Sequence, residues 1–349
     1  MSFPPFSRDR VFALVRRAYA TAAALTVLIL FAQPAAIAEM ATPDKARATE
    51  LEQRVLDIVH MFENDPRFNR GKTPQQIKDG VEFVTGNVLF VLGHEVAHAL
   101  ISQFELPVLG REEDAADALS TIIALKMGNS FADRVVINAA KGWFLSDQRD
   151  KKEGVSTDFY DEHGMDVQRA YYVVCLMVGG APEKFMKLAE EVKLPEERQS
   201  SCKFDYSNAS WSWEQVLKPH LRKPEDPKTK IEVNYVPTVE FATLSELGRK
   251  LQILEAMATW LSEDFAWKRP ITLEMQECGD PGARWDPINK KVIICYEVIR
   301  EFVQLHRSYG QAALVAEPMK MSKNKKIVAA KPSAKGRSQK AFRTKRTRR

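Results

Sequence analysis

The spacing of apolar residues predicts a chain made mostly of helices. Between residues 43 and 192, apolar side chains recur at every third or fourth position, which is the period of a helix with one buried face. The run Thr73-Pro74-Gln75-Gln76 is typical of a helix start, because it offers a capping hydroxyl, an early proline and a glutamine three residues later. The predicted helices are 43–62, 73–102, 110–127, 167–178 and 182–192, with a further helix and a charged loop over 131–153 and a turn and short helix over 194–198.

The pattern changes after residue 220. Residues 221–238 are rich in Pro and Lys and predict a linker with one short extended piece. A helix is predicted over 239–265. Apolar runs at 271–275 and 291–296 then predict the two strands of a hairpin, followed by a last helix at 297–305. The predicted fold class is therefore α+β, predominantly α-helical, with a small sheet or β-hairpin.

An apolar run in the second long helix contains the pattern His-Glu-x-x-His. His94 and His98 lie one turn apart on a helix, so both imidazoles leave the same face. This spacing suits two nitrogens of one tetrahedral zinc site, at Zn–N distances of about 2.0–2.1 Å. Glu95 lies beside the first of them and is placed to take a proton from a zinc-bound water. On its own the pattern also occurs by chance in amphipathic helices.

A hydrolytic zinc site needs a third protein ligand and one open position. The next predicted helix starts with acidic residues, among which Glu113 and Asp117 share one face. We predict that Glu113 is the third ligand and that Asp117 accepts the free ring N–H of His94. Glu112 is the alternative ligand, but it has Ala116 four residues on and lacks such a partner. Acidic residues at a helix start also serve simply to complement the helix dipole, so the prediction rests on both motifs together.

The two motifs together resemble the gluzincin branch of zinc peptidases, in which Glu-x-x-x-Asp follows His-Glu-x-x-His. The run Leu-Pro-Val-Leu-Gly-Arg-Glu-Glu-Asp-Ala-Ala-Asp at 106–117 is similar to a bacterial family known as putative metallopeptidases. The similarity covers roughly residues 81–220 and 271–300. It implies a zincin-like fold with the small sheet beside the zinc helix, bound Zn²⁺ and hydrolysis of peptide bonds, but no particular substrate.

A further candidate residue rests on this resemblance. In the metallopeptidase family an Asp-Glu-His similar to residues 161–163 precedes an apolar helix. His163 is therefore a candidate catalytic residue that donates to the oxyanion formed during hydrolysis. The alternative is a histidine that caps the N-terminus of that helix and takes no part in chemistry.

The resemblance also extends to a possible substrate-binding strand. The run Gly-Ala-Arg-Trp at 282–285 resembles the Asn-Ala-x-aromatic stretch of the gluzincin edge strand, which pairs with the peptide main chain. Ala283 and Trp285 match this pattern, whereas Gly282 replaces the Asn. In zincins this strand precedes the zinc helix, and here it follows. The alternative is a disulfide-closed hairpin that only packs.

Residues 1–38 predict a secretory signal peptide. Four Arg residues precede an apolar stretch over 18–32, and Ala-Ile-Ala at 36–38 offers a small-residue cleavage site. A retained membrane anchor is the alternative, but the apolar stretch is short for a span. We therefore expect an exported protein, periplasmic or secreted, with no transmembrane helix after removal of the signal.

The cysteine content agrees with export. Four cysteines, an even number, suit an oxidising compartment, and the sequence alone allows three pairings. We expect Cys175 to pair with Cys202 and Cys278 with Cys295, because each pair closes a local loop. A cysteine-rich zinc site is the alternative, but no two cysteines have Cys-x-x-Cys spacing.

The formal net charge of +5 belongs to the end of the chain. Residues 318–349 hold 8 Lys and 5 Arg and no acidic residue, so the predicted domain is net acidic. Since it has almost no apolar content, 317–349 is predicted to be a disordered basic tail. Such a tail suits an acidic surface. The alternative is a solvated extension without a partner, and specific nucleic-acid binding is not predicted.

These features predict a single metallopeptidase-like domain over 39–316, between the signal peptide and the tail. The predicted function is that of an exported zinc-dependent peptidase, with Glu95 as general base and a peptide or protein as substrate. The alternative is a catalytically inactive zinc-binding or scaffold protein of the cell envelope on the same fold.

Overall fold

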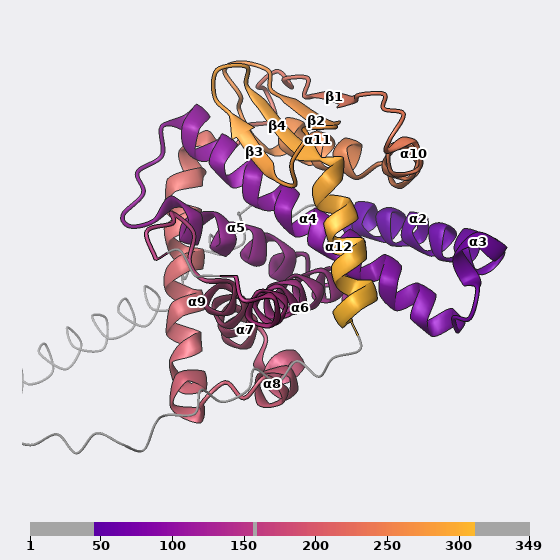
Figure 1. The fold of residues 1–349 in the computed structure, drawn as a ribbon. Helices are drawn as coiled ribbons and strands as arrows, with labels where there is room; N and C mark the ends of the chain where they lie inside the picture. Colours follow the sequence, from indigo (N-terminus) through magenta and orange to yellow (C-terminus); the bar gives the residue numbers. More distant parts are fainter. Residues whose placement is uncertain (1–44, 156–158, 311–349) are drawn as a thin grey trace, which may run out of the picture. The chain divides into compact units, whose positions relative to one another are not determined.

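The computed structural model describes residues 45–155 and 159–310, so the predicted signal peptide and basic tail lie outside the described residues. Within these ranges helices dominate, and four short strands form one sheet (Figure 1). The elements in chain order are α2 (Lys45–Glu63), α3 (Pro66–Asn69), α4 (Pro74–Phe104), α5 (Glu112–Met127), α6 (Ser130–Glu153), α7 (Asp166–Gly180), α8 (Pro182–Glu191), α9 (Glu196–Leu217), the 3₁₀ turn η1 (Lys218–His220), β1 (Glu232–Tyr235), α10 (Ala242–Leu251), α11 (Ile253–Asp264), β2 (Thr272–Gln276), β3 (Ala283–Asp286), β4 (Lys291–Cys295) and α12 (Tyr296–Tyr309).

Helix α4 is the central element. Its start carries the predicted cap, because Thr73 Oγ1 accepts from the backbone N–H of Gln76 at 3.2 Å and Gln76 Oε1 accepts from that of Thr73 at 2.9 Å. It ends where Glu105 adopts a left-handed conformation with φ 53°. Helices α2, α5, α6 and α12 and strands β3 and β4 all contact α4. Among the described helices, α4 alone is long and apolar enough to cross a membrane, but most of its apolar stretch is buried inside the protein.

A layer of helices packs on one side of α4. Helices α5 and α6 lie directly against it, and α7 packs against α5, α6 and α9. The disulfide Cys175–Cys202 joins α7 to α9, with a Cα–Cα distance of 5.0 Å. A Cβ atom at Gly179 would lie 2.2 Å from the carbonyl oxygen of Cys202, so only glycine permits this close approach. Helix α7 is thereby fixed within the layer.

Helix α9 is longer than the sequence predicts. The pattern predicts a short helix at 194–198, whereas α9 continues to Leu217. Its sequence has no continuous apolar stripe, and its buried residues are Cys202, Ser210, Trp213 and Leu217. Tertiary contacts hold it instead, including the disulfide and a 3.1 Å bond from Trp213 Nε1–H to the carbonyl oxygen of Ala115. Periodicity does not reveal such contacts.

The sheet has the strand order β1-β2-β4-β3. Strands β1, β2 and β4 are parallel, and β3 runs antiparallel to β4 at the edge. The predicted hairpin of 271–275 with 291–296 is therefore wrong, because these segments, β2 and β4, pair in parallel and the hairpin partner of β4 is β3. The predicted helix over 239–265 is also divided, since Gln252 has φ 53° between α10 and α11. The predicted linker over 221–238 contains β1.

The sheet and the helical layer lie on opposite sides of α4 (Figure 1). Strands β3 and β4 contact α4, and α12 continues from β4 and packs along the same helix. The disulfide Cys278–Cys295 closes the loop that contains β3. The structure confirms the predicted α+β class, predominantly helical, and it places the small sheet beside the helix that carries His94 and His98.

Candidate metal centre

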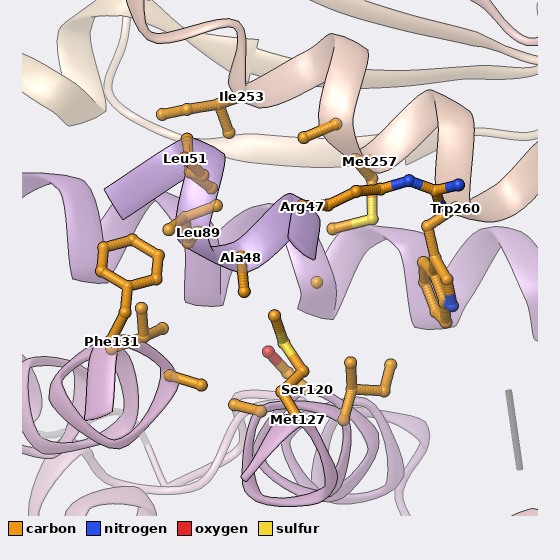
Figure 2. A pocket seen from close by; sticks show the side chains of 16 residues that line it. Arg47, Ala48, Leu51, Leu89, Ser120, Met127, Phe131, Ile253, Met257 and Trp260 are labelled. Atoms are coloured by element: carbon orange, nitrogen blue, oxygen red, sulfur yellow. The ribbon is translucent and has the colours of Figure 1, made fainter. Parts of the chain in front are cut away.

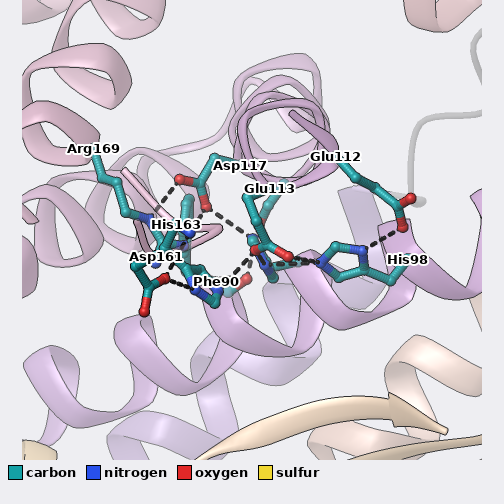
Figure 3. A network of polar contacts seen from close by, with 10 residues as sticks. Phe90, His98, Glu112, Glu113, Asp117, Asp161, His163 and Arg169 are labelled. Atoms are coloured by element: carbon teal, nitrogen blue, oxygen red, sulfur yellow. Dashed lines mark hydrogen bonds and ion pairs between the residues drawn. The ribbon is translucent and has the colours of Figure 1, made fainter. Parts of the chain in front are cut away.

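The residues predicted to bind a metal come together between α4 and α5 (Figure 3). His94 Nε2 lies 3.0 Å from Glu113 Oε2, and His98 Nε2 lies 3.3 Å from Glu113 Oε1. The two Nε2 atoms are 3.1 Å apart. These ligand atoms all lie within 4.8 Å of one another. The structure therefore brings His94, His98 and Glu113 to one point, as the spacing of the two motifs predicts.

The outer nitrogens of both imidazoles face carboxylates. His94 Nδ1 lies 2.8 Å from Asp117 Oδ1, and His98 Nδ1 lies 2.7 Å from Glu112 Oε1. A carboxylate only accepts, so each Nδ1 carries the proton. In a neutral ring the Nε2 atom then presents its lone pair, and two such lone pairs converge with those of Glu113. This donor set fits a bound cation, since a cation satisfies all three acceptors at once.

As predicted, the carboxylate of Asp117 contacts the ring of His94. The sequence predicts Glu112 only as an alternative ligand, whereas the structure places its carboxylate beside the outer nitrogen of His98. Its position next to Glu113 is the signal that could have suggested this role. Two adjacent acids at a helix start can face two successive histidines of a neighbouring helix.

Sequence analysis also missed Arg169, which comes from α7. Its Nε–H and Nη2–H groups both donate to Asp117, each at 2.8 Å. The guanidinium carbon lies 3.8 Å from the ring centroid of Trp143, a cation–π contact. Burial disfavours a charged Asp117, but the bonds from His94 and Arg169 still hold the pKa of this carboxyl below its usual value. An arginine within an apolar helix was the available signal, because a buried arginine needs an acidic partner.

A glycine allows α5 to approach this part of α4. A Cβ atom at Gly93 would lie 2.6 Å from Ser120 Oγ, which donates to the carbonyl oxygen of Phe90 at 2.9 Å. Gly93 directly precedes the first histidine of the motif. The close contact of the helices at this point helps to bring Glu113 and Asp117 within reach of His94.

Glu95 lies at the sheet side of the same helix. It is 7% exposed, and burial raises the pKa of its carboxyl, while His94 and His98 oppose that rise. The carboxylate accepts a hydrogen bond from the backbone N–H of Trp285 in β3. The predicted general base and the predicted substrate-binding strand are therefore in direct contact.

The main-chain groups of β3 alternate between the sheet and its outer edge. Cys295 N–H donates to the carbonyl oxygen of Gly282 at 3.1 Å, so this pair is of the hydrogen-bonded type. Alternation in an antiparallel ladder then turns the main-chain groups of Ala283 and Trp285 away from β4. The Trp285 bond to Glu95 agrees with this direction. Both predicted residues are thus on the edge that faces α4.

His163 also reaches the centre. Its Nε2 atom lies 2.9 Å from Glu113 Oε2, and its Nδ1 atom lies 3.0 Å from Asp161 Oδ1 (Figure 3). Helix α7 begins only at Asp166, and Met165 occupies its cap position. The His163 ring contacts these two acids and also stacks near the ring of His94, with 6.4 Å between the ring centroids, and the side chain is half exposed.

Comparison with known proteins identifies the family of the chain. A family model described as "Putative metallopeptidase" matches residues 52–217 and 236–329, which include every residue of the candidate centre. No curated protein and no solved structure matches the chain. The family description indicates a metal-dependent peptidase, and the His–His–Glu cluster offers a site for the metal. Because the match covers well over half of the sequence, the chain belongs to this metallopeptidase family.

Proposed function

We propose that the protein is an exported zinc-dependent peptidase of the gluzincin type. The observation that carries the proposal is the convergence of His94 Nε2, His98 Nε2 and a Glu113 oxygen within 4.8 Å of one another. Two imidazoles and one carboxylate are the donor set of several catalytic zinc sites. Three protein ligands leave the fourth position of a tetrahedral ion for water or substrate.

The residues around the cluster support this assignment of zinc. Outer hydrogen bonds to carboxylates fix the tautomer and the orientation of ligand imidazoles. Asp117 does this for His94 and Glu112 for His98. When bound, the ion supplies a Lewis acid for the peptide carbonyl and for the attacking water.

Proton transfer is the proposed role of Glu95. Its carboxylate takes a proton from the attacking water and passes it to the leaving amine. The backbone N–H of Trp285 holds the carboxylate through one hydrogen bond. This bond fixes its direction and leaves the other lone pairs free to accept the proton.

The edge of β3 is the proposed site of the substrate main chain. The main-chain groups of Ala283 and the carbonyl oxygen of Trp285 turn away from β4 and can pair with an extended peptide, whereas the Trp285 N–H is held by Glu95. An edge strand binds main chain without regard to side chains, so specificity has to come from other parts of the cleft.

His163 is proposed to donate to the oxyanion that forms on the substrate carbonyl. Its Nε2 atom contacts Glu113 in this structure, so this role requires that contact to yield. If the contact persists, His163 instead positions the ligand carboxylate.

Metal analysis and peptide cleavage test the proposal. The full chain is expected to bind one zinc ion and to cleave casein or a peptide library in a chelator-sensitive way, with recovery on zinc addition. Glu95→Gln should keep the metal and lose at least about 100-fold in activity, as expected for a general base. Glu190→Gln, an exposed change on α8, is the matched control. A metal-loaded protein that cleaves nothing supports the inactive zinc-binding alternative.

Export is part of the proposal and has its own test. The two disulfides support an oxidising compartment. N-terminal sequencing of the mature protein should find a start directly after Ala38. A mature chain that still begins at Met1 in the cytoplasm would contradict export.

A further inference from the structure

We propose that the protein binds a long-chain fatty acid in a cavity separate from the metal centre. The cavity has a volume of about 470 Å³, which lies within the range of about 300–1,000 Å³ found for ligand pockets. It lies among α2, α3, the first half of α4, α10 and α12, which gather at one end of the fold (Figure 1). It includes none of the metal-centre residues, so the proposal does not depend on the proposed peptidase activity.

The wall of the cavity is apolar on several sides. It includes the side chains Phe62, Phe68, Val84, Leu244, Leu247 and Met275. Most of these are only partly buried in the free protein, although Met275 is fully covered. Apolar surface that is gathered in a concave site and left accessible marks a ligand-binding site more often than a packing defect. A flexible hydrocarbon chain matches such a lining, because it needs no hydrogen-bond partners.

Polar groups gather where α4 begins and α12 ends. Lys72 lies just before α4 and Gln76 in its first turn, and His306 and Arg307 come from the last turn of α12. The two groups lie together, since a Cβ atom at Gly80 would lie 3.4 Å from His306 Cε1. The pocket therefore has an apolar body and one end that is rich in hydrogen-bond donors.

The charges at this end favour an anion. No ion pair joins Lys72 or Arg307 to an acidic side chain among the described residues. By contrast, Arg300 on the same helix as Arg307 is paired with Glu240 at 2.6 Å. The nearby acid Asp79 accepts from Gln75 Nε2 at 2.7 Å. A single carboxylate at the end of an acyl chain would complement the two unpaired cations.

A smaller cavity on the other side of Ile253 does not share this character. It has a volume of about 110 Å³ and lies under α2, beside Leu51, Leu89 and Met257 (Figure 2). Its one cation, Arg47, is already paired with Glu263. Ile253 borders both cavities. We therefore assign the fatty acid to the larger cavity, which has both the greater volume and two cations without an ion pair among the described residues.

Calorimetric titration of the delipidated full-length protein tests the proposal. Saturated fatty acids of increasing length should bind at one site, with affinity rising about fourfold per added methylene until the cavity is full. The methyl ester of the best acid should bind more weakly, because it lacks the charge. Absence of saturable binding across the series would overturn the proposal.

Variants locate the site. Leu247→Trp and Val303→Trp fill the cavity from α10 and α12, and each should lower the affinity at least about tenfold in folded protein. Val239→Trp, at a residue 98% exposed, is their control. If both filling variants fold and bind the acid as well as the wild type, the assigned cavity is wrong.

A second pair of variants tests the charge. Lys72→Gln with Arg307→Gln should weaken acid binding about three- to tenfold and leave the ester unchanged, as expected for exposed ion pairs. Lys203→Gln with Arg269→Gln, two exposed changes elsewhere, is the control. Binding of vesicles of anionic phospholipid without binding of free acid would overturn the proposal, because it would indicate a membrane-facing surface instead.

Discussion

Replacement of Arg169 by methionine removes the buried cation that holds Asp117 against His94. Arg169 is 8% exposed and Asp117 only 1%, so water cannot replace the two 2.8 Å bonds that are lost. Removing one partner of a buried ion pair costs about 3–5 kcal/mol of stability, because the remaining charge stays buried. Loss of a group bonded directly to a metal ligand lowers metal affinity about 10- to 100-fold, and because Arg169 acts on such a group, Asp117, we expect a loss at the lower end of this range. We therefore expect both effects in Arg169→Met.

Two assays separate these effects. Urea denaturation in the presence of a chelator gives the free energy of unfolding of the metal-free protein. Competition with a chromophoric chelator gives the zinc affinity. Adding Asp117→Asn to Arg169→Met removes the stranded charge, so the double variant should regain stability. It should not regain zinc affinity, because the bond to His94 is weaker from an amide than from a carboxylate.

Arg149→Met is the matched control, since Arg149 pairs with Glu301 near the surface. Its loss should cost no more than about 1 kcal/mol. The reasoning is refuted if Arg169→Met unfolds within 1 kcal/mol of the wild type and binds zinc equally well. In that case Asp117 keeps its position through His94 and the surrounding packing alone.

Three further predictions follow from the same geometry. The methyl group of Gly93→Ala would lie 2.6 Å from the hydroxyl oxygen of Ser120 in α5, so this variant should lose about 1–3 kcal/mol of unfolding free energy and bind zinc more weakly. Gly282→Ala, with open space around it, is the control, and equal stability and zinc affinity of the two variants would contradict the argument. Burial lowers the pKa of His306, so the stability of the protein should fall as the pH drops below about 6.5, where the unfolded chain takes up the proton. His306→Gln should flatten this pH dependence in urea denaturation, and a profile identical to that of the wild type would contradict this assignment to His306. Glu112→Gln should weaken zinc binding less than tenfold, as measured by chelator competition, because this partner of His98 is half exposed and water can take its place. A loss of affinity above about 100-fold would mean that Glu112 is itself a ligand.

The sequence was most informative where the deciding interactions are local. The cap at Thr73 and the apolar residues that follow it predict α4, since both depend on residues close in the chain. The i, i+4 spacings within α4 and α5 predict which side chains share a face. The convergence of His94, His98 and Glu113, with Asp117 beside His94, was therefore predictable from two such faces.

Long-range pairing was not predictable in the same way. The strands β2 and β4 are close in sequence, and their pattern predicts a hairpin. The chain forms β3 between them in sequence, however, and β3 pairs antiparallel with β4 at the edge, so β2 and β4 run parallel. Arg169 belongs to the centre only because α7 packs on α5, which no local pattern shows. The sequence predicts Glu113 as the ligand and Glu112 only as its alternative, whereas in the folded protein Glu113 contacts both histidines and Glu112 contacts the outer nitrogen of His98.

The length of α4 has a consequence for how this protein tolerates insertions and deletions. One unbroken helix of 31 residues carries a wall of the larger cavity near its start and the two histidines near its end. One residue added or lost between them turns one part relative to the other by about 100°. Either the imidazoles swing away from α5 or the cavity wall swings away from α12. We expect length changes among relatives to be absent from this stretch and to collect in the surface connections, such as the one between α4 and α5.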